Sequence, residues 1–169
     1  MAKTNIPKGK LVRKFGENIF GNPKFDNLLN KKPYTPGQHG PNRRRRLSNY
    51  GIQLQAKQKL KAYYGNINER QFRNTYRKAL AKKGDTTENL IALLESRLDT
   101  IIYRAKFATT IFSARQLINH GHVKVNKKKV NIASYSVKEE DTIEIRDKSK
   151  QLAIIDIALA SKEREAPEY

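Results

Sequence analysis

The sequence predicts an α+β protein with three regions. A basic, loop-rich extension covers residues 1–47, and a helical domain covers 48–93 and continues with 150–169. Residues 94–149 are expected to form a small module of two helices packed on a short antiparallel sheet. Three observations predict this: five of the six prolines lie in the first 47 residues, apolar residues then recur every three or four positions, and after Gly121 that period shortens to two.

The extension carries a segment that excludes helix. Residues 32–41 (KPYTPGQHGP) contain three prolines, each of which fixes the backbone and removes an N–H donor. We expect an ordered turn there, formed against a partner.

The helical domain carries cap signals in order along the chain. A helix over 48–63 is predicted to stop at Gly65, where a left-handed residue ends helices readily. Asn68 and Gln71 resemble a capping box ahead of a second helix. Asp85 repeats the device ahead of a third, with apolar positions at Leu90, Leu93, Leu94, Leu98, Ile101 and Ile102.

The module follows. On the last of those helices Arg97 and Arg104 are seven residues apart, which predicts that both lie on one side. A further helix is predicted to be capped by Ser113, to stop at Gly121 and to bury Ala114, Leu117 and Ile118. It would present Arg115, Gln116 and Asn119 to solvent.

Period-two alternation predicts three strands after Gly121, with turns at 126–129 and 138–141. The inward residues are Val123 and Val125, Val130 and Ile132, and Ile143 and Ile145. On the first strand His122, Lys124 and Asn126 alternate outward.

Charge indicates the class of partner. The chain has 35 Lys and Arg against 16 Asp and Glu, a formal net charge of +19. Residues 27–68 contain no acidic residue, whereas 136–169 carry six basic and nine acidic residues. Nucleic acid is the commonest polyanion that neutralises such a surface. With no apolar run near the roughly 18 residues of a spanning helix and no secretory signal, we expect a soluble, intracellular protein and no membrane partner.

Metal and cofactor chemistry is not predicted. Cysteine is absent, so disulfides and thiolate sites are excluded. His120 and His122 share a strand face and could ligate a metal, but the sequence places no third or fourth ligand. No glycine-rich phosphate loop follows a strand, so we expect no cofactor, no metal and no small-molecule substrate.

Several motifs resemble a known family. Residues 95–104 (ESRLDTIIYR) and 113–126 (SARQLINHGHVKVN) closely resemble the RNA-binding domain of the ribosomal protein S-four family. Residues 36–41 (PGQHGP), 57–60 (KQKL) and 68–72 (NERQF) resemble its N-terminal half. The resemblance runs in order through nearly the whole chain. Some members bind zinc through N-terminal cysteines, which this sequence lacks. Members also usually continue for several tens of residues beyond the segment that residues 165–169 (EAPEY) resemble.

The resemblance implies a non-catalytic constituent of the small ribosomal subunit, in a bacterium or an organelle. Such a protein binds a junction in the 5′ domain of rRNA early in assembly. It also lies near the mRNA entrance beside the small-subunit proteins S-five and S-three, and contributes to translational accuracy. The implied RNA-binding residues are Arg43, Arg44, Arg45, Arg46, Lys57, Lys59, Arg70, Arg73, Arg97, Arg104, Ser113, Arg115, Gln116, His120, His122, Lys124 and Lys128.

Two alternatives stay open. The same module occurs in some pseudouridine synthases, whose nucleophile is the Asp of an Arg-Leu-Asp motif, and residues 97–99 have that sequence. In those enzymes the motif lies in a separate catalytic domain, so we expect Asp99 to pair with an Arg on its own helix. The second alternative is a free-standing RNA-binding regulator, such as a translational repressor.

Overall fold

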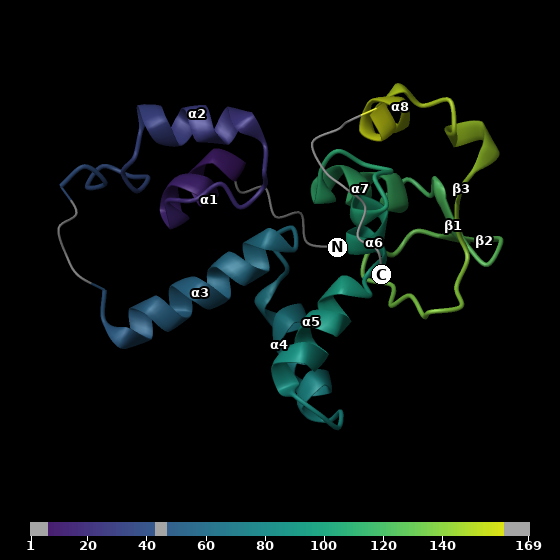
Figure 1. The fold of residues 1–169 in the computed structure, drawn as a ribbon, viewed down its shortest axis with the longest axis horizontal. Coiled ribbons are helices and arrows are strands. Elements are labelled where there is room, and N and C mark those ends of the chain that lie inside the picture. Colours follow the sequence, from purple (N-terminus) through teal and green to yellow (C-terminus); the bar gives the residue numbers. More distant parts are fainter. Residues whose placement is uncertain (1–6, 43–46, 161–169) are drawn as a thin grey trace. The chain divides into compact units, whose positions relative to one another are not determined.

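The computed structural model describes residues 7–42 and 47–160, which divide into two compact units, 1–68 and 69–169 (Figure 1). The helices of the first unit are α1 (Lys8–Phe15), α2 (Pro23–Lys31) and α3 (Asn49–Tyr63). Those of the second are α4 (Glu69–Leu80), α5 (Thr86–Glu95), α6 (Leu98–Arg104), α7 (Ile111–Asn119) and α8 (Ala153–Ala160), with a 3-10 turn η1 (Asp147–Ser149). The strands are β1 (Val123–Val125), β2 (Lys128–Val130) and β3 (Ile143–Ile145).

The first unit contains two helices that the sequence analysis did not predict. In α1, Leu11 and Val12 are buried, and α1 packs against α2 and α3. Helix α2 begins with a recognisable signal, because the Asn22 side chain accepts a hydrogen bond from the Lys24 N–H and Pro23 occupies the first helical position. Residues 32–42 contain no helix, as the prolines predicted.

Helix α3 confirms the helix predicted over 48–63. The Ser48 hydroxyl accepts a hydrogen bond from Gly51 N–H at its start. Past its end, Gly65 has a φ of 75°, the left-handed conformation predicted there.

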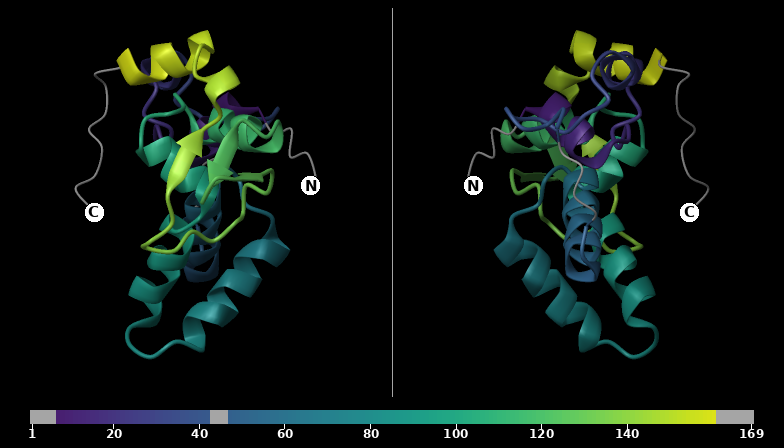
Figure 2. Two further views of the ribbon diagram at one scale, coloured as in Figure 1. Left: turned by 90° about the vertical axis from the view of Figure 1, so that its right-hand side faces the viewer. Right: turned by 90° about the vertical axis from the view of Figure 1, so that its left-hand side faces the viewer.

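Helices α4 and α5 form a hairpin that leads away from the sheet (Figure 2). The turn ends at Asp85, whose carboxylate accepts from the Thr87 and Glu88 N–H groups and so begins α5 as predicted. These hydrogen bonds lower the pKa of Asp85 because they favour its ionised form, and the bond from the Thr87 N–H has the largest effect.

The prediction that one helix continues through residue 97 is wrong. The chain leaves the helix after Glu95 and restarts at Leu98, because the backbone there pairs with the segment that follows β2. Leu98 N–H donates to Tyr135 O at 2.9 Å, Asp99 N–H to Ala133 O at 3.1 Å, and Val137 N–H to Ser96 O at 2.9 Å. These long-range bonds replace the helical ones, so Arg97 and Arg104 do not share a continuous helix.

Helix α7 begins earlier than predicted, and its cap is Thr110 rather than Ser113. The Thr110 hydroxyl accepts a hydrogen bond from Ser113 N–H at 3.2 Å. The earlier start also buries Ile111. The predicted burial of Ala114, Leu117 and Ile118 is confirmed, as is the stop at Gly121, where φ is 72°.

The sheet is antiparallel, with the order β2-β1-β3. Asn126 and Lys127 both have positive φ and form the tight β1–β2 turn, so β2 begins inside the predicted turn of 126–129. Strand β2 ends at Val130, and Ile132, predicted to face inward, is 53% exposed because the chain turns between Ile132 and Tyr135.

The core of the module lies between the sheet and helices α6 and α7. Its fully buried members include Leu98, Ile102, Ile118 and Val123, and Ile155 of α8 joins them. Two helices packed on a short antiparallel sheet were the predicted architecture, and it is confirmed. The predicted domain boundaries at 47/48 and 93/94 stay a prediction.

No helix among the described residues has the length and apolar character needed to cross a membrane.

Candidate nucleic-acid interface

The outer face of the sheet carries a line of polar side chains. Lys124 on β1 is in register with Lys129 on β2 and with Glu144 on β3. Directly paired residues of antiparallel strands point to the same side, and this side is opposite to buried Val123 and Val125. The prediction that Lys124 alternates outward is therefore confirmed, and Lys129 lies beside it.

Lys128 lies on the other side of the sheet. It is in register with Val125, which faces the core, and it is exposed because it stands next to the turn. Its assignment as an RNA-binding residue stays a prediction, but its side chain does not extend the face formed by Lys124 and Lys129.

The two histidines join this face to the end of α7. The ring centroids of His120 and His122 lie 5.9 Å apart, and His122 Nδ1 lies 2.9 Å from the Ser149 hydroxyl. Gly121, between them, leaves room for Lys129, because a Cβ at that position would overlap its side chain. Within residues 7–42 and 47–160 there is no group of three or more potential metal-ligating side chains.

Three arginines of the module, Arg97, Arg104 and Arg115, form ion pairs with carboxylates. Arg104 donates to Glu95 through Nε at 3.1 Å and Nη2 at 2.8 Å. Arg97 grips both oxygens of Asp99, through Nε at 3.0 Å and Nη2 at 2.8 Å, and Arg115 Nε reaches the same carboxylate at 2.7 Å. Asp99 therefore pairs with an arginine at the start of its own helix, as expected, and with one from α7.

Arg97 does not occupy the exposed position that the sequence predicted. Its side chain is only 9% exposed, against 29% for Arg104 and 19% for Arg115. The reason is the break before α6, which turns Arg97 inward onto Asp99. Its contact with RNA stays a prediction.

The remaining candidates of α7 lie apart from these ion pairs. Gln116 is exposed on the helix. Ser113 is half-buried, and its backbone N–H is engaged by Thr110.

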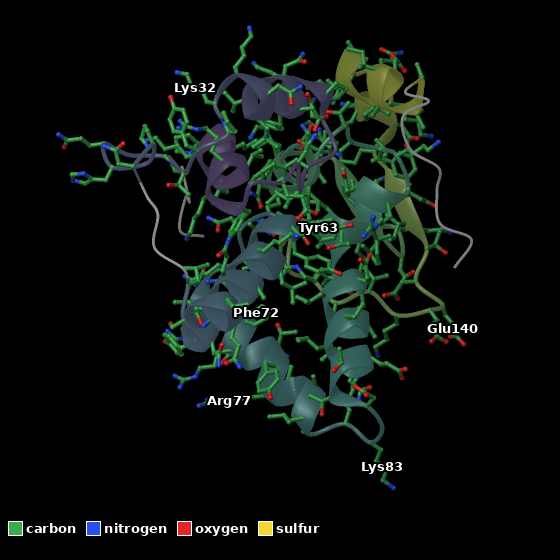
Figure 3. All side chains as sticks on the ribbon, turned by 60° about the vertical axis from the view of Figure 1, so that its left-hand side comes forward. Lys32, Tyr63, Phe72, Arg77, Lys83 and Glu140 are labelled. Carbon is green, nitrogen blue, oxygen red and sulfur yellow. The ribbon has the colours of Figure 1, made fainter. Side chains whose placement is uncertain are left out.

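Helix α4 adds a second basic face to the same unit. Arg70, Arg73 and Arg77 follow one another at helical spacing and are all exposed, whereas Phe72 and Ala79 are buried. Figure 3 shows Arg77 pointing away from the hairpin and Lys83 extending from its tip.

The first unit holds the other predicted residues. Lys57 and Lys59 lie on α3, where Lys59 forms an ion pair with Glu17. Arg43, Arg44, Arg45 and Arg46 fall outside the described residues.

Acidic side chains border the sheet face. Asp147 lies 2.8 Å from Lys150 Nζ and 3.8 Å from Lys124 Nζ. Both cations lower the pKa of Asp147, and Lys150 has the larger effect. The pKa of Lys150 is raised by the same carboxylate. At the other end of the strands, Asp141 accepts hydrogen bonds from the Lys138 N–H and from the side-chain amide of Asn126. These bonds lower the pKa of Asp141.

This arrangement suits RNA. Guanidinium forks match phosphate oxygens, ammonium groups neutralise them, and imidazole and amide groups reach 2′-hydroxyls and base edges. Ion pairs hold Arg97, Arg104 and Arg115 in fixed orientations, so this part of the surface is organised before any partner arrives.

Comparisons with known proteins agree with this geometry. Residues 3–95 match the family described as "Ribosomal protein S4/S9 N-terminal domain", and residues 96–143 match "S4 domain". The chain belongs to the ribosomal protein S4 family. The S4 domain match covers α6, α7, β1 and β2 and ends at the first residue of β3, and the other match covers α1 to α5.

Curated members of the S4 family match along the full length of the chain. "Small ribosomal subunit protein uS4" of Pelagibacter ubique (strain HTCC1062) is 70% identical over 169 residues, which are all of this chain and 82% of the relative. The proteins of the same name from Brucella abortus (strain S19) and Brucella ovis are each 57% identical with the same coverage.

Sequence reasoning missed several cations of the S4 family member, of which Arg77, Lys127 and Lys129 are exposed and Arg146 is half-buried. Arg77 continues the spacing of Arg70 and Arg73, which was a usable signal. Lys127 and Lys129 lie in the hairpin that carries Lys128, but choosing among these three lysines needs the strand register. Arg146, which donates to Gly121 O at 3.3 Å, gave no local signal.

Proposed function

We propose that this protein is a structural constituent of the small ribosomal subunit that binds rRNA. The observation that carries the proposal is the continuous face of His120, His122, Lys124 and Lys129 in an S4 domain of a chain with a net charge of +19. The named relatives are small-subunit proteins, which supports the same assignment.

Affinity and specificity have different sources in this proposal. Lysine and arginine contacts with phosphates supply affinity through counterion release, so each lost contact lowers the salt slope of log K by roughly 0.7 to 0.9. The shape of a folded RNA junction supplies specificity, because a protein surface with fixed arginines fits only some arrangements of phosphates.

The proposed contacts include residues beyond the module. They are Arg43, Arg44, Arg45, Arg46, Lys57, Lys59, Arg70, Arg73, Arg77, Arg104, Ser113, Arg115, Gln116, His120, His122, Lys124, Lys127 and Lys129. Lys128, on the other side of the sheet, is proposed to make no phosphate contact. Arg97 acts mainly by holding Asp99. The three predicted regions, 1–47, 48–93 with 150–169, and 94–149, are proposed as the domains of the protein.

We further propose that the protein is not an enzyme and makes or breaks no covalent bond. Asp99, the residue that a synthase would use as nucleophile, is 0% exposed and accepts hydrogen bonds from two arginines and the Thr100 N–H. A carboxylate in that environment does not meet a substrate. The proposed setting is a bacterial ribosome, beside the rRNA 5′ domain junction, proteins S-five and S-three, and the mRNA entry site, with an early role in assembly.

Filter binding of the full chain tests the proposal. The probes are a transcript of the small-subunit rRNA 5′ domain and a transcript of equal length from the large-subunit rRNA, at about 0.15 M salt, where screening weakens general attraction. We expect the 5′ domain to bind at least about a hundredfold more tightly, a threshold set below the roughly thousandfold or greater specificity ratios of sequence-specific DNA-binding proteins. Equal affinity for the two transcripts refutes the rRNA assignment.

A further inference from the structure

The Asp99 carboxylate is the most enclosed charged group among the described residues. It is 0% exposed, and four hydrogen bonds reach it. Oδ1 accepts from Arg97 Nε and the Thr100 N–H, and Oδ2 accepts from Arg97 Nη2 and Arg115 Nε. Burying a carboxylate is costly unless it is paired and hydrogen-bonded, and here the pairing is complete.

The two arginines are not equivalent. Arg97 comes from the position before α6, grips both oxygens and is 9% exposed. Arg115 comes from α7, sixteen residues away, and keeps 19% of its side chain exposed. Two guanidinium charges against one carboxylate leave the cluster with a net charge of +1, and Arg115 is the member that brings it to the surface.

We infer that Asp99 is a positioning residue for RNA recognition: it fixes the guanidinium of Arg115 in the orientation that meets a phosphate, while Arg97 compensates the charge of Asp99. This inference rests on the proposed function. Helices α6 and α7 pack side by side, so the bond also ties the orientation of Arg115 to the packing of the module (Figure 1).

The advantage is entropic. An arginine side chain has many accessible rotamers, and an unrestrained one loses part of that entropy when it binds. Arg115 has already lost part of it on folding. Holding a donor in place before binding favours one arrangement of phosphates over others, which is specificity rather than general attraction.

Asp99→Asn separates the effect of net charge from that of orientation. The substitution favours RNA binding through charge and disfavours it through the lost orientation of Arg115. The substitution raises the net charge of the cluster from +1 to +2, which strengthens attraction to any polyanion. It also removes the charged acceptor that orients the Arg115 Nε–H. Binding to the 5′ domain transcript should weaken about tenfold, the lower-middle part of the range for coupled neighbours, whereas binding to a nonspecific RNA of equal length should stay unchanged or tighten.

A matched control removes one carboxylate that holds no arginine. Glu140 projects outward from the loop before β3 (Figure 3). Glu140→Gln adds the same charge as Asp99→Asn, so it should leave both affinities unchanged or raise both slightly. Unchanged specific binding by Asp99→Asn would overturn the inference, as would a parallel fall in specific and nonspecific binding by a variant whose urea unfolding matches that of the wild type.

Two measurements do not require Asp99→Asn to fold. Arg115→Lys keeps the charge and the Asp99–Arg97 pair but cannot reproduce the Nε bond, so it should weaken specific binding about tenfold without altering nonspecific binding. Lys148→Arg, which also keeps the charge and lies at an exposed position outside the proposed contacts, should have little effect. Equal effects at the two positions contradict the inference.

The second measurement is nitrogen-15 relaxation of arginine Nε–H groups in the wild-type protein without RNA. We expect an order parameter near the rigid value of about 0.85 for Arg115 and below about 0.6 for Arg73. Equal mobility overturns the positioning role whatever the RNA result. If the wild type itself does not prefer the 5′ domain, the proposed function fails, and the inference falls with it even where Arg115 is rigid.

Discussion

The strand register makes a prediction about two adjacent lysines that composition alone cannot distinguish. Lys129→Met and Lys128→Met each remove one charge from neighbouring exposed positions, so any effect of net charge is equal. Methionine keeps an unbranched chain, which can still cover Gly121 when it replaces Lys129. Only Lys129 lies beside Lys124 on the outer face.

The magnitude follows from one phosphate contact. Losing one lowers the salt slope of log K by roughly 0.7 to 0.9. Between about 50 and 200 mM salt, a fourfold change, the deficit of Lys129→Met relative to wild type should therefore shrink by roughly threefold. Lys128→Met should show a nearly constant ratio to wild type over the same range.

Filter binding to the 5′ domain transcript at five or six salt concentrations measures both slopes. Unfolding in urea, followed for both variants, checks that stability changes by less than about 0.5 kcal/mol, as for ordinary surface substitutions. Equal slopes for the two variants, or a smaller slope for Lys128→Met, would refute the assignment of the outer sheet face as the RNA-binding surface.

Three further predictions concern the module and its caps. Leu98→Ala, at a fully buried core position, should lower the free energy of unfolding by about 2 to 5 kcal/mol in urea denaturation, against about 0.5 kcal/mol or less for Ile132→Ala at an exposed one; similar losses would misplace the core. Gly121→Ala should lower the free energy of unfolding by about 1 to 2 kcal/mol because φ is 72°, and by a further amount because the new Cβ meets the Lys129 side chain. Adding Lys129→Ala should restore only the part due to that contact, and full restoration would contradict the backbone argument. The pKa of Asp85 is lowered in the folded protein, so its stabilisation is complete above the ordinary value of 3.8 and is lost as pH falls through the folded value. Asp85→Asn should therefore make the acid decline of unfolding free energy shallower, and an unchanged pH profile would exclude Asp85 as a contributor.

Local signals predicted much of the fold. Helices α3 and α5 start where Ser48 and Asp85 accept backbone hydrogen bonds, and left-handed glycines follow α3 and α7 at Gly65 and Gly121. The alternation of buried and outward-facing residues in β1 could also be predicted from the sequence, because one face of a three-stranded sheet must be apolar. Each of these features depends on residues within a few positions of one another.

The errors arise from partners that are distant in the sequence. The helix break at Arg97 depends on carbonyl and amide groups of residues 133–137, and no residue close to it in the sequence indicates a break. The cap of α7 was ambiguous because Thr110 and Ser113 are both suitable, and burial of Ile111 accompanies the earlier one. The orientation of Arg97 and the choice of Lys129 over Lys128 needed tertiary contacts and strand register.

Competition at fixed salt tests the central claim most directly. The full chain, bound to labelled 5′ domain rRNA at about 0.15 M salt, is challenged with unlabelled 5′ domain rRNA or with double-stranded DNA of the same phosphate content. We predict that the rRNA displaces the label at a concentration at least about a hundredfold lower than the DNA does. Displacement at equal concentrations would mean that the surface recognises charge alone, and would contradict the account.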